Sequence, residues 1–388
     1  MDLIVFEDSK TAQFGPLADT RHLAELRCGL WSMLERCERL AVSVARLWGR
    51  PGVCDWAHDR LGRRVNETAE QPARFLSARV LWWDLPEADR GNVLGMIDDT
   101  VVCAVLSDPA AIGPEDALAD RWPDVPRIDV SDCGRLIDWP WELVLKNGDQ
   151  IAADLRDEPP TAYAEPGVHV VGSQLTIGEG TAIGPGVAID TEPGPVWIGS
   201  GVTIKPNATI EGPCVIGDRC LIQPHAQIHD GVTLGPWCKI GGEVEASIVQ
   251  GYSNKQHLGF LGHSYLGEWI NLGAGCTTSD LKNTYGEVSV PIHADGSPQP
   301  TGSLFCGLLA GDYAKLGINT AVPTGAVVGV GSNVMGTRVP KRTPAMQWVV
   351  DGEAQPFEVD KAVTIARRMM ARRDRALTAS GEAVLRAV

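Results

Sequence analysis

The segment from Gly251 to Gly286 concentrates side chains suited to chemistry on a small polar substrate. His257 carries an imidazole that titrates near neutrality, so it can act as a general base toward an amine, or it can simply bond a loop carbonyl. Asn271 can hydrogen-bond a hydroxyl or a phosphate, or belong to an asparagine ladder at a turn. Lys255 and Lys282 can supply positive charge or be solvated surface lysines. Such chemistry requires elements that hold these groups in register.

A repeat of six residues supplies such an element. One large aliphatic side chain stands at every sixth position from Ile198 to Ile240, and a small residue follows each of them four positions later. The large positions are Ile198, Ile204, Ile210, Ile216, Ile222, Ile228, Leu234 and Ile240, and the small ones are Val202, Ala208, Cys214, Cys220, Ala226, Val232, Cys238 and Val244. This period fits a short strand and a tight turn repeated around a coil with an aliphatic interior. Because one repeat cannot bury its face alone, the pattern predicts a stack of coils.

The repeat is interrupted in places that point to function. It runs from Ile177 to Ile189, gains extra residues between Thr191 and Trp197, and resumes from Leu309 to Val334. Two stretches do not fit the repeat, Ser253–His257 and roughly Thr278–Ser303. We expect the chain to leave the coil there. Since loops that project from a rigid scaffold often carry function, we expect the site near these stretches.

Composition excludes several classes of partner. The 388 residues carry a net charge of −15 and a pI of about 5.0, which argues against a nucleic-acid groove or an anionic membrane face. There is no leading apolar run and no stretch of 18 apolar residues, so we expect a cytoplasmic protein without a membrane partner. Several of the ten cysteines occupy the small position of the repeat, so we expect reduced core thiols.

Three regions follow from these patterns. Residues 1–158 mix strand-like and helix-like segments and predict an α/β domain. Residues 167–338 hold the six-residue repeats and predict the coil, and a charged, proline-rich segment separates the two regions. Residues 355–388 predict a basic amphipathic helix that either caps the coil or a neighbouring subunit, or grips a phosphate. Its arginines are Arg367, Arg368, Arg372, Arg373 and Arg375.

The text from Gly251 onward reads Gly-Tyr-Ser-Asn-Lys-Gln-His-Leu-Gly-Phe-Leu-Gly-His-Ser-Tyr-Leu-Gly-Glu-Trp-Ile-Asn-Leu-Gly-Ala-Gly-Cys-Thr-Thr-Ser-Asp-Leu-Lys-Asn-Thr-Tyr-Gly. It resembles the acetyltransferase half of the bifunctional N-acetylglucosamine-1-phosphate uridylyltransferase and glucosamine-1-phosphate acetyltransferase. With Phe6-Glu-Asp, the text from Pro16 to Gly29 and that from Trp139 to Asn147, the chain resembles more closely a family of sugar nucleotidyltransferases. That family joins a hexapeptide coil to a short N-terminal nucleotidyltransferase-like domain. The resemblance spans most of the chain and implies a left-handed parallel β-helix, assembled as a homotrimer with active sites in clefts between neighbouring coils.

The resemblance also implies roles for individual residues. His257 matches the general base, Asn271 matches an asparagine that places the sugar, and Tyr285 matches a substrate-contacting tyrosine. The backbone near Ala274 is expected to lie against the thioester of acetyl-CoA, the implied acyl donor, where its N–H groups stabilise the oxyanion. A basic cluster after the coil contacts the phosphates of coenzyme A or is merely solvated, and it comprises Arg338, Lys341 and Arg342.

The chain departs from this pattern at positions that grip the sugar. Gln223 stands near the place of an arginine, Gly241-Gly242 replaces an expected lysine pair, and Phe260 replaces a tyrosine. We therefore expect a different acceptor, with Lys255 or Lys282 as the source of the missing positive charge.

The N-terminal domain is expected to be either a nucleotidyltransferase or a degenerate relative that keeps only the fold and subunit contacts. Nucleotidyl transfer needs a glycine-rich loop around the triphosphate and an acidic residue that holds Mg²⁺. The loop from Glu7 to Gly15 lacks the glycine-rich signature. Arg21 and Arg27 are candidate phosphate ligands, and Glu7 or Asp8 is the candidate for Mg²⁺ bound with a nucleoside triphosphate.

The sequence thus favours a sugar-nucleotide-pathway transferase that acylates an amino sugar phosphate or a nucleotide amino sugar. A sugar-1-phosphate nucleotidyltransferase using UTP or dTTP is an alternative that can coexist in one chain, and a non-catalytic trimeric scaffold that binds a sugar nucleotide is another. A zinc enzyme of the γ-carbonic anhydrase type is disfavoured, and we expect no resident metal in the coil. His225 and His229 are separated by four residues where that family uses five, which places His257 and His263 out of register with them.

Overall fold

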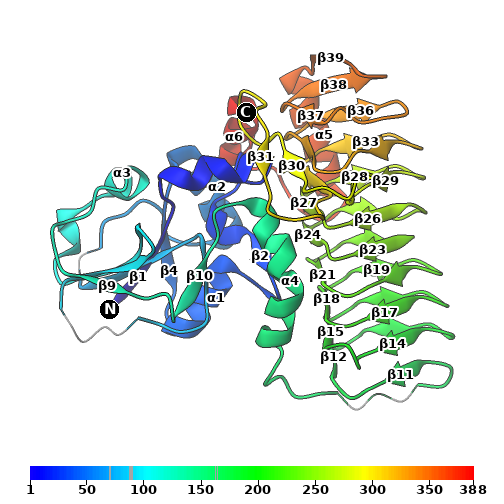
Figure 1. The fold of residues 1–388 in the computed structure, drawn as a ribbon, viewed down its shortest axis with the longest axis horizontal. Coiled ribbons are helices and arrows are strands. Elements are labelled where there is room, and N and C mark those ends of the chain that lie inside the picture. Colours follow the sequence, from blue (N-terminus) through cyan, green and yellow to red (C-terminus); the bar gives the residue numbers. More distant parts are fainter. Residues whose placement is uncertain (70, 87–90, 162, 164) are drawn as a thin grey trace.

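The computed structural model describes residues 1–388 except residues 70, 87–90, 162 and 164. An α/β domain lies on one side of a long coil of parallel strands, and the C-terminal helices return to the junction between them (Figure 1). None of the helices in the described part of the chain has the length and apolarity needed to cross a bilayer.

The N-terminal domain is built on a mixed sheet in the order β4-β1-β5-β8-β7-β9. β1 lies between β4 and β5 and is parallel to both, whereas β8 is antiparallel to its neighbours. The apolar run from Leu3 to Phe6 is buried on both faces, as expected for a central parallel strand. The strands are β1 (Asp2–Phe6), β4 (Ala45–Trp48), β5 (Ala73–Ser77), β7 (Val93–Ile97), β8 (Thr100–Leu106) and β9 (Arg127–Asp129).

Short helices and hairpins surround this sheet. α1 begins at a capping box in which Ser32 and Glu35 satisfy each other's backbone N–H groups. α2 and α4 each begin at a proline, which is favoured in the first helical turn. The helices are η1 (Ser9–Leu17), η2 (Leu23–Glu25), α1 (Met33–Ala41), α2 (Pro51–Leu61), η3 (Pro109–Ala111), α3 (Pro114–Leu118) and α4 (Pro140–Asp154). β2 (Arg27–Cys28) and β3 (Trp31–Ser32) form a hairpin, and β6 (Val80–Trp82) pairs antiparallel with β10 (Gly134–Leu136), which follows much later in the chain.

The coil has three sheets in the described part of the chain, which we name by their surroundings; their strand pairs are parallel except for the last pair of one sheet. The outer face, far from the N-terminal domain (Figure 1), contains β11 (His169–Val171), β14 (Ala188–Asp190), β17 (Thr209–Glu211), β20 (Gln227–Ile228), β23 (Glu243–Glu245) and β26 (Phe260–Gly262). It continues through β29 (Thr277–Thr278) and β34 (Ala321–Val322). The domain face, against the N-terminal domain, contains β12 (Leu175–Ile177), β15 (Val196–Ile198), β18 (Cys214–Ile216), β21 (Val232–Leu234), β24 (Ile248–Gly251), β27 (Tyr265–Glu268), β32 (Leu308–Ala310), β35 (Ala326–Val328) and β37 (Arg342–Thr343).

The remaining sheet is the helix face, because the C-terminal helix α5 reaches over its edge. It contains β13 (Ala182–Ile183), β16 (Thr203–Ile204), β19 (Leu221–Ile222), β22 (Lys239–Ile240), β25 (Asn254–Lys255), β28 (Asn271–Leu272), β33 (Lys315–Leu316), β36 (Asn333–Met335), β38 (Gln347–Val350) and β39 (Glu353–Pro356). The coil strands therefore continue past residue 338. The range 355–388, expected to form a single helix, instead begins at the end of β39 and folds into α5 (Val359–Ala371) and α6 (Ala379–Ala387).

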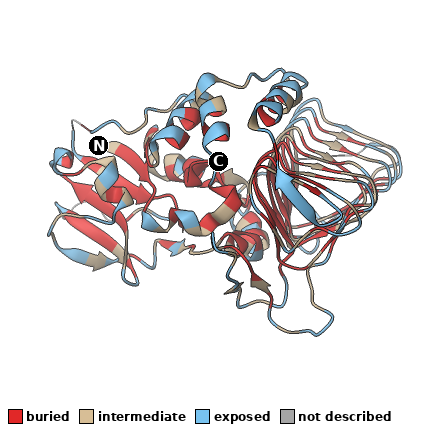
Figure 2. Cartoon of the chain, turned by 90° about the horizontal axis from the view of Figure 1, so that it is seen from above, coloured by how far each residue is buried: buried red, intermediate tan, exposed pale blue. Residues whose placement is uncertain are grey.

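The predicted interior of the coil is confirmed. Ile198 stacks on Ile216, which stacks on Leu234, and the large and small positions of the repeat are buried. Seen from above, these buried residues fill the inside of the coil (Figure 2). The cysteines at the small positions are free and buried, consistent with core thiols.

One of the two predicted interruptions is wrong. Ser253–His257 does not leave the coil, because β25 lies within it and pairs with β22 and β28. The coil is shortened there instead, since Thr233 pairs with Ile248. The second interruption is real: the chain leaves the outer face after Thr278, forms a hairpin of β30 (Ser289–Val290) and β31 (Gln299–Pro300), and returns at Leu308.

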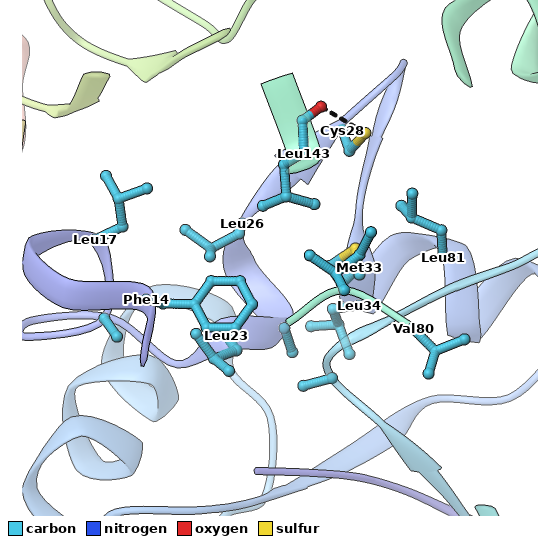
Figure 3. Packing of buried hydrophobic residues seen from close by; sticks show 14 of the residues in the cluster. Phe14, Leu17, Leu23, Leu26, Cys28, Met33, Leu34, Val80, Leu81 and Leu143 are labelled. Atoms are coloured by element: carbon cyan, nitrogen blue, oxygen red, sulfur yellow. Dashed lines mark hydrogen bonds between the residues drawn. The ribbon is translucent and has the colours of Figure 1, made fainter. Parts of the chain in front are cut away.

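The two domains share a core. Ile248 and Tyr265 of the domain face belong to the same hydrophobic cluster as the N-terminal residues around Leu26. Figure 3 shows the N-terminal part of this cluster, where Phe14 packs near Leu23 and Leu26 and the carbonyl of Leu143 accepts from the Cys28 thiol at 3.4 Å. α4 lies on the domain face, where the Asn147 amide donates to the Gly231 carbonyl at 2.8 Å. The coil and the α/β domain therefore form one packed unit.

Candidate functional site

A cavity of about 340 Å³ lies between the helix face and α5, and we call it the helix-face pocket. Its lining combines amides, aromatic rings and cations. The lining residues are Tyr252, Asn254, Gln256, Trp269, Asn271, Lys315, Ile365, Met369, Arg372 and Arg373. Among the described residues, no aspartate or glutamate lines this pocket.

The floor of the pocket belongs to a column of polar residues on successive coils, in which Asn254, Asn271 and Lys315 line the pocket and Lys239 lies one coil before them. Lys239 pairs with Asn254, Asn254 with Asn271, and Asn271 with Lys315. Side chains alternate between the two sides of a strand, so these residues point outward while the next residue of each strand points into the coil. The register of the coil thus brings together polar groups that are far apart in sequence.

An aromatic wall closes one side of the pocket. The rings of Tyr252 and Trp269 stack with centroids 4.5 Å apart, and Trp269 lies 6.3 Å from Tyr313. Tyr252 and Trp269 follow strands of the domain face and have positive φ angles, which turn the chain toward the helix face. Because Trp269 is buried and stacked between Tyr252 and Tyr313, the wall is an apolar boundary of the pocket and offers no open face of the Trp269 ring.

The cations of the pocket have few partners. The Lys315 ammonium donates to the Tyr313 carbonyl at 2.6 Å, and burial lowers its pKa to about 8. Arg373 donates to the Asn254 side-chain oxygen at 3.3 Å, and its buried Nε has no hydrogen-bond partner among the described residues. Burial, and then the charges of Arg373 and Arg372, lower the pKa of Lys239. Positive charge is therefore concentrated here without neutralisation.

The predicted base lies beside this pocket. His257 is exposed in the turn after β25, at the corner between the helix face and the outer face, and it follows Gln256 of the pocket lining. Asn271 is itself part of the lining. Ala274 lies in the turn of the next coil, where the neighbouring Gly275 N–H donates to the Leu258 carbonyl at 3.0 Å. The structure thus places His257, Asn271 and Ala274 on adjacent coils at or next to one corner.

Lys255 occupies a different environment from the other predicted site residues. It pairs with Ile240, so its side chain takes the inward position of the coil and is buried. The ammonium donates to the carbonyls of Gly241 at 2.6 Å and His257 at 3.1 Å, and burial lowers its pKa to about 8. Lys255 therefore fixes the backbone of the turn that carries His257 and does not face the pocket.

The remaining coil residues predicted from the sequence lie at or near another corner. Tyr285 is exposed and Lys282 donates to the Glu287 carbonyl, both in the loop that leaves the outer face after β29. Lys341 donates to the Thr324 carbonyl, and burial together with the charge of Lys282 lowers its pKa. Arg342 donates to the Ala294 carbonyl at 3.0 Å, and Arg338 is exposed next to β34. Within one chain, these residues are separate from the corner of His257.

In the N-terminal domain, Arg21 is surrounded by carboxylates. Its guanidinium lies 3.5 Å from Glu25, 3.1 Å from Glu268 and 2.9 Å from Asp312. Arg27 lies 3.6 Å from Glu35, and its backbone N–H donates to the Tyr265 hydroxyl at 2.8 Å. A phosphate at Arg21 would have to displace carboxylates that already neutralise it.

The acidic residues after β1 are also engaged. Glu7 accepts hydrogen bonds from the Leu23 N–H at 3.0 Å and from Arg50 at 2.9 Å. Burial by itself would raise the pKa of Glu7, but the charges of His22 and Arg50 hold it below its ordinary value. Asp8 accepts from the buried Arg79 at 2.8 Å. The described residues contain no group of three or more His, Cys, Asp or Glu side chains arranged to hold a metal ion. The acidic groups after β1 do not fit a Mg²⁺ site, because arginines already occupy their oxygens.

Fold and site define a two-part class: a short α/β domain fused to a hexapeptide coil with a polar pocket on one of its faces. Residues 3–157 match the family model described as sugar nucleotidyl transferase, and residues 195–230 match the model of bacterial transferase hexapeptide repeats. The chain therefore carries a sugar nucleotidyltransferase domain followed by hexapeptide repeats of the left-handed β-helix type, as the sequence predicted.

Two curated proteins show sequence similarity to parts of the chain. The bifunctional protein GlmU of Rippkaea orientalis is 33% identical over 141 residues, which cover 36% of this chain and 30% of that protein. The bifunctional sugar-1-phosphate nucleotidylyltransferase/acetyltransferase of Sulfurisphaera tokodaii is 30% identical over 93 residues, covering 24% of this chain and 23% of that protein. The chain thus spans less than a third of the length of either relative.

Among solved structures, the Arabidopsis UDP-N-acetylglucosamine acyltransferase is similar over 55% of this chain and 80% of its own, with 13% identity and a TM-score of 0.27. WeeI from Acinetobacter baumannii AYE is similar over 45% of this chain and 55% of its own, with 15% identity and a TM-score of 0.22. Likenesses at these TM-scores carry no structural argument.

Proposed function

We propose that this protein transfers an acyl group from acetyl-CoA to the amine of a phosphorylated or nucleotide-linked amino sugar. The observation that carries the proposal is the exposed imidazole of His257 beside a polar pocket that contains Asn271, with the Ala274 turn on the next coil. The names of the two curated relatives, each of which is bifunctional, support the same class of substrate.

In the proposed reaction, His257 takes the proton of the sugar amine as its nitrogen attacks the thioester carbonyl. The new C–N bond forms, the C–S bond breaks, and the imidazolium returns the proton to the departing thiolate of coenzyme A. Backbone N–H groups of the turn near Ala274 stabilise the negative oxygen that develops on the carbonyl, and Asn271 orients the sugar.

A homotrimer is part of this proposal. In this proposal a neighbouring subunit brings its basic and aromatic loop residues to the site of His257, namely Lys282, Tyr285, Lys341, Arg342 and Arg338. Coenzyme A and sugar phosphates are anions, whereas the chain carries a net charge of −15, so local basic clusters are needed to attract them. The use of acetyl-CoA is consistent with the cytoplasmic location expected from the sequence.

The experiment compares His257→Asn with His225→Asn. His225 is exposed in the turn after β19, at the same corner two coils away, so it matches His257 in surroundings but not in position. With acetyl-CoA and a panel of amino sugar phosphates, the release of free thiol is expected to fall by about 100-fold or more in the first variant, the usual contribution of a general base. The His225 variant should match the native rate. Native activity in His257→Asn would remove His257 from the reaction.

Nucleotidyl transfer with UTP or dTTP is the second candidate, because residues 3–157 match the sugar nucleotidyl transferase model. Ion pairs at Glu7 and Asp8 weigh against it, since those oxygens are already bound by arginines. The test is Mg²⁺-dependent release of pyrophosphate from sugar 1-phosphates with each nucleotide. If neither activity is found while a sugar nucleotide binds, the chain is a non-catalytic scaffold.

A further inference from the structure

We propose that the helix-face pocket binds a phosphorylated monosaccharide, and that the C-terminal helix α5 supplies its phosphate grip through Arg373, assisted by Lys315, Arg372 and Lys239. This inference deepens the proposed function by naming the acceptor class and the residues that hold its phosphate. It assigns a ligand-binding role to α5, a segment outside the coil.

The charge of the pocket is the first argument. Buried or partly buried cations are costly unless a counter-charge or several hydrogen bonds compensate them. Lys315 has one carbonyl partner, and the side chain of Arg373 has one amide oxygen and one distant carbonyl. Since no carboxylate lines the pocket among the described residues, an anionic ligand is the group that completes it.

The free hydrogen-bond donors are the second argument. The buried Nε of Arg373 has no hydrogen-bond partner among the described residues, and the rest of its guanidinium makes only two long hydrogen bonds, at 3.3 and 3.4 Å, so donors remain for a phosphate oxygen. The amides of Asn254, Gln256 and Asn271 lie in the same lining, where they can bond sugar hydroxyls. The stacked rings of Tyr252 and Trp269 form an apolar boundary on one side of the pocket.

The other cations of the two C-terminal helices are either paired with carboxylates or, like Arg368, exposed to solvent. Arg367 pairs with Glu382 of α6, and Arg386 pairs with Asp360 and Glu382. Lys361 pairs with Glu358 one turn away. Arg372 and Arg373 lie at the end of α5, where the pocket offers them only neutral groups and Lys315.

The size of the pocket restricts the ligand. About 340 Å³ is at the small end of the volumes that ligand sites usually have, roughly 300 to 1,000 Å³. A monosaccharide phosphate fits this volume better than a nucleotide sugar does. Because Asn271 lines the pocket and Gln256 precedes His257, a sugar held here by its phosphate lies next to the proposed base.

The experiment measures binding by isothermal titration calorimetry, without catalysis. The probes are glucosamine 1-phosphate, glucosamine 6-phosphate and inorganic phosphate, with neutral glucosamine as the control ligand. The variants are Arg373→Gln and Lys315→Met, and the control variant is Arg368→Gln, which alters an exposed arginine of the same helix.

We expect native protein to bind at least one sugar phosphate more tightly than glucosamine, and each pocket variant to weaken that binding by about 10-fold or more. Arg368→Gln should bind as the native protein does. The proposal is overturned if native protein binds no phosphorylated probe at millimolar concentration, or if Arg373→Gln and Lys315→Met both retain native affinity. Tight binding of inorganic phosphate but no gain from the sugar would overturn the monosaccharide assignment. Because His257→Asn should keep this binding, loss of the acyltransferase hypothesis and loss of the pocket hypothesis give different results.

Discussion

Two cavities are both lined by Tyr252 and Trp269, and they differ in whether their positive charges are neutralised by carboxylates. The interdomain cavity, of about 460 Å³, has arginines that are paired with carboxylates. The helix-face pocket has arginines and a lysine but no carboxylate in its described lining. A cluster of arginines therefore does not by itself indicate a phosphate site. Arginines whose charges are already neutralised form a structural network, whereas arginines without a counter-charge are candidates for a binding site.

The network of the interdomain cavity joins the two domains. Arg21 belongs to the N-terminal domain, whereas Glu268 and Asp312 belong to the coil. Burial by itself would lower the pKa of Arg21, but the charges of these carboxylates raise it above its ordinary value. Burial likewise opposes ionisation of Glu25, yet the charges of Arg60 and Arg21 hold its pKa low. The ion pairs are mutually satisfied, so removal of one member leaves the others buried and unpaired.

The largest expected effect is therefore that of Arg21→Met. Loss of the guanidinium leaves Glu25, Glu268 and Asp312 without a shared counter-charge, which should lower the free energy of unfolding by about 3 to 5 kcal/mol. Urea unfolding monitored by tryptophan fluorescence measures this change. Arg121→Met, which breaks an exposed ion pair with Asp116, should cost less than about 1 kcal/mol. A comparable loss in both variants would remove the distinction between the two cavities.

The next largest expected effect is a tenfold fall in the affinity of the helix-face pocket for a sugar phosphate as pH rises. Lys315 has a pKa of about 8, below the ordinary 10.5, so it is protonated at pH 7 and loses its charge as pH rises through 8. Affinity for a sugar phosphate should fall by about 10-fold between pH 7 and pH 9.5, because a charge pair about 4 Å apart is worth at least about 1 kcal/mol and a tenfold change in affinity is about 1.4 kcal/mol. Titration calorimetry across this range measures it. Lys315→Arg keeps its charge and should flatten the profile; an unchanged slope in that variant would exclude Lys315 as the titrating group.

The same lysine should have the opposite effect on stability from Arg21. Because the pKa of Lys315 is lower in the folded chain, the native protein gains stability as pH rises from about 8 to 10.5, and it loses that stability as pH falls from 10.5 to about 8. Lys315→Met removes the buried charge and should raise the free energy of unfolding at pH 7 by about 1 kcal/mol. This gain should shrink toward pH 10. Destabilisation at pH 7 would show that Lys315 supports the fold and not a ligand.

The sequence was sufficient to predict the coil but not the pocket. The six-residue repeat specifies the coil directly, since each large position from Ile198 to Ile222 stacks on the one a full coil later. The pocket instead combines residues of separate coils with the end of α5, and only the register and the docking of that helix bring them together. The helical spacing of the C-terminal arginines was visible, but their lack of partners was not. Alternating polar residues at outward positions, such as Asn254 and Asn271, were the available signal.

Lys255 was misplaced for a related reason, and it provides the smallest test of the comparison. The shortened coil before β25 shifts the repeat, so that Lys255 takes the inward position below Leu272 and caps two carbonyls of the corner. Both Lys255 and Lys315 have a pKa of about 8, but only Lys315 lines the helix-face pocket.

Lys255→Met should therefore change the free energy of unfolding at pH 7 by no more than about 1 kcal/mol, because loss of the buried charge is offset by loss of its hydrogen bonds. Its affinity for sugar phosphates should equal that of native protein, measured beside Lys315→Met under the same conditions. Equal loss of affinity in both lysine variants would show that total charge, and not position in the pocket, governs binding.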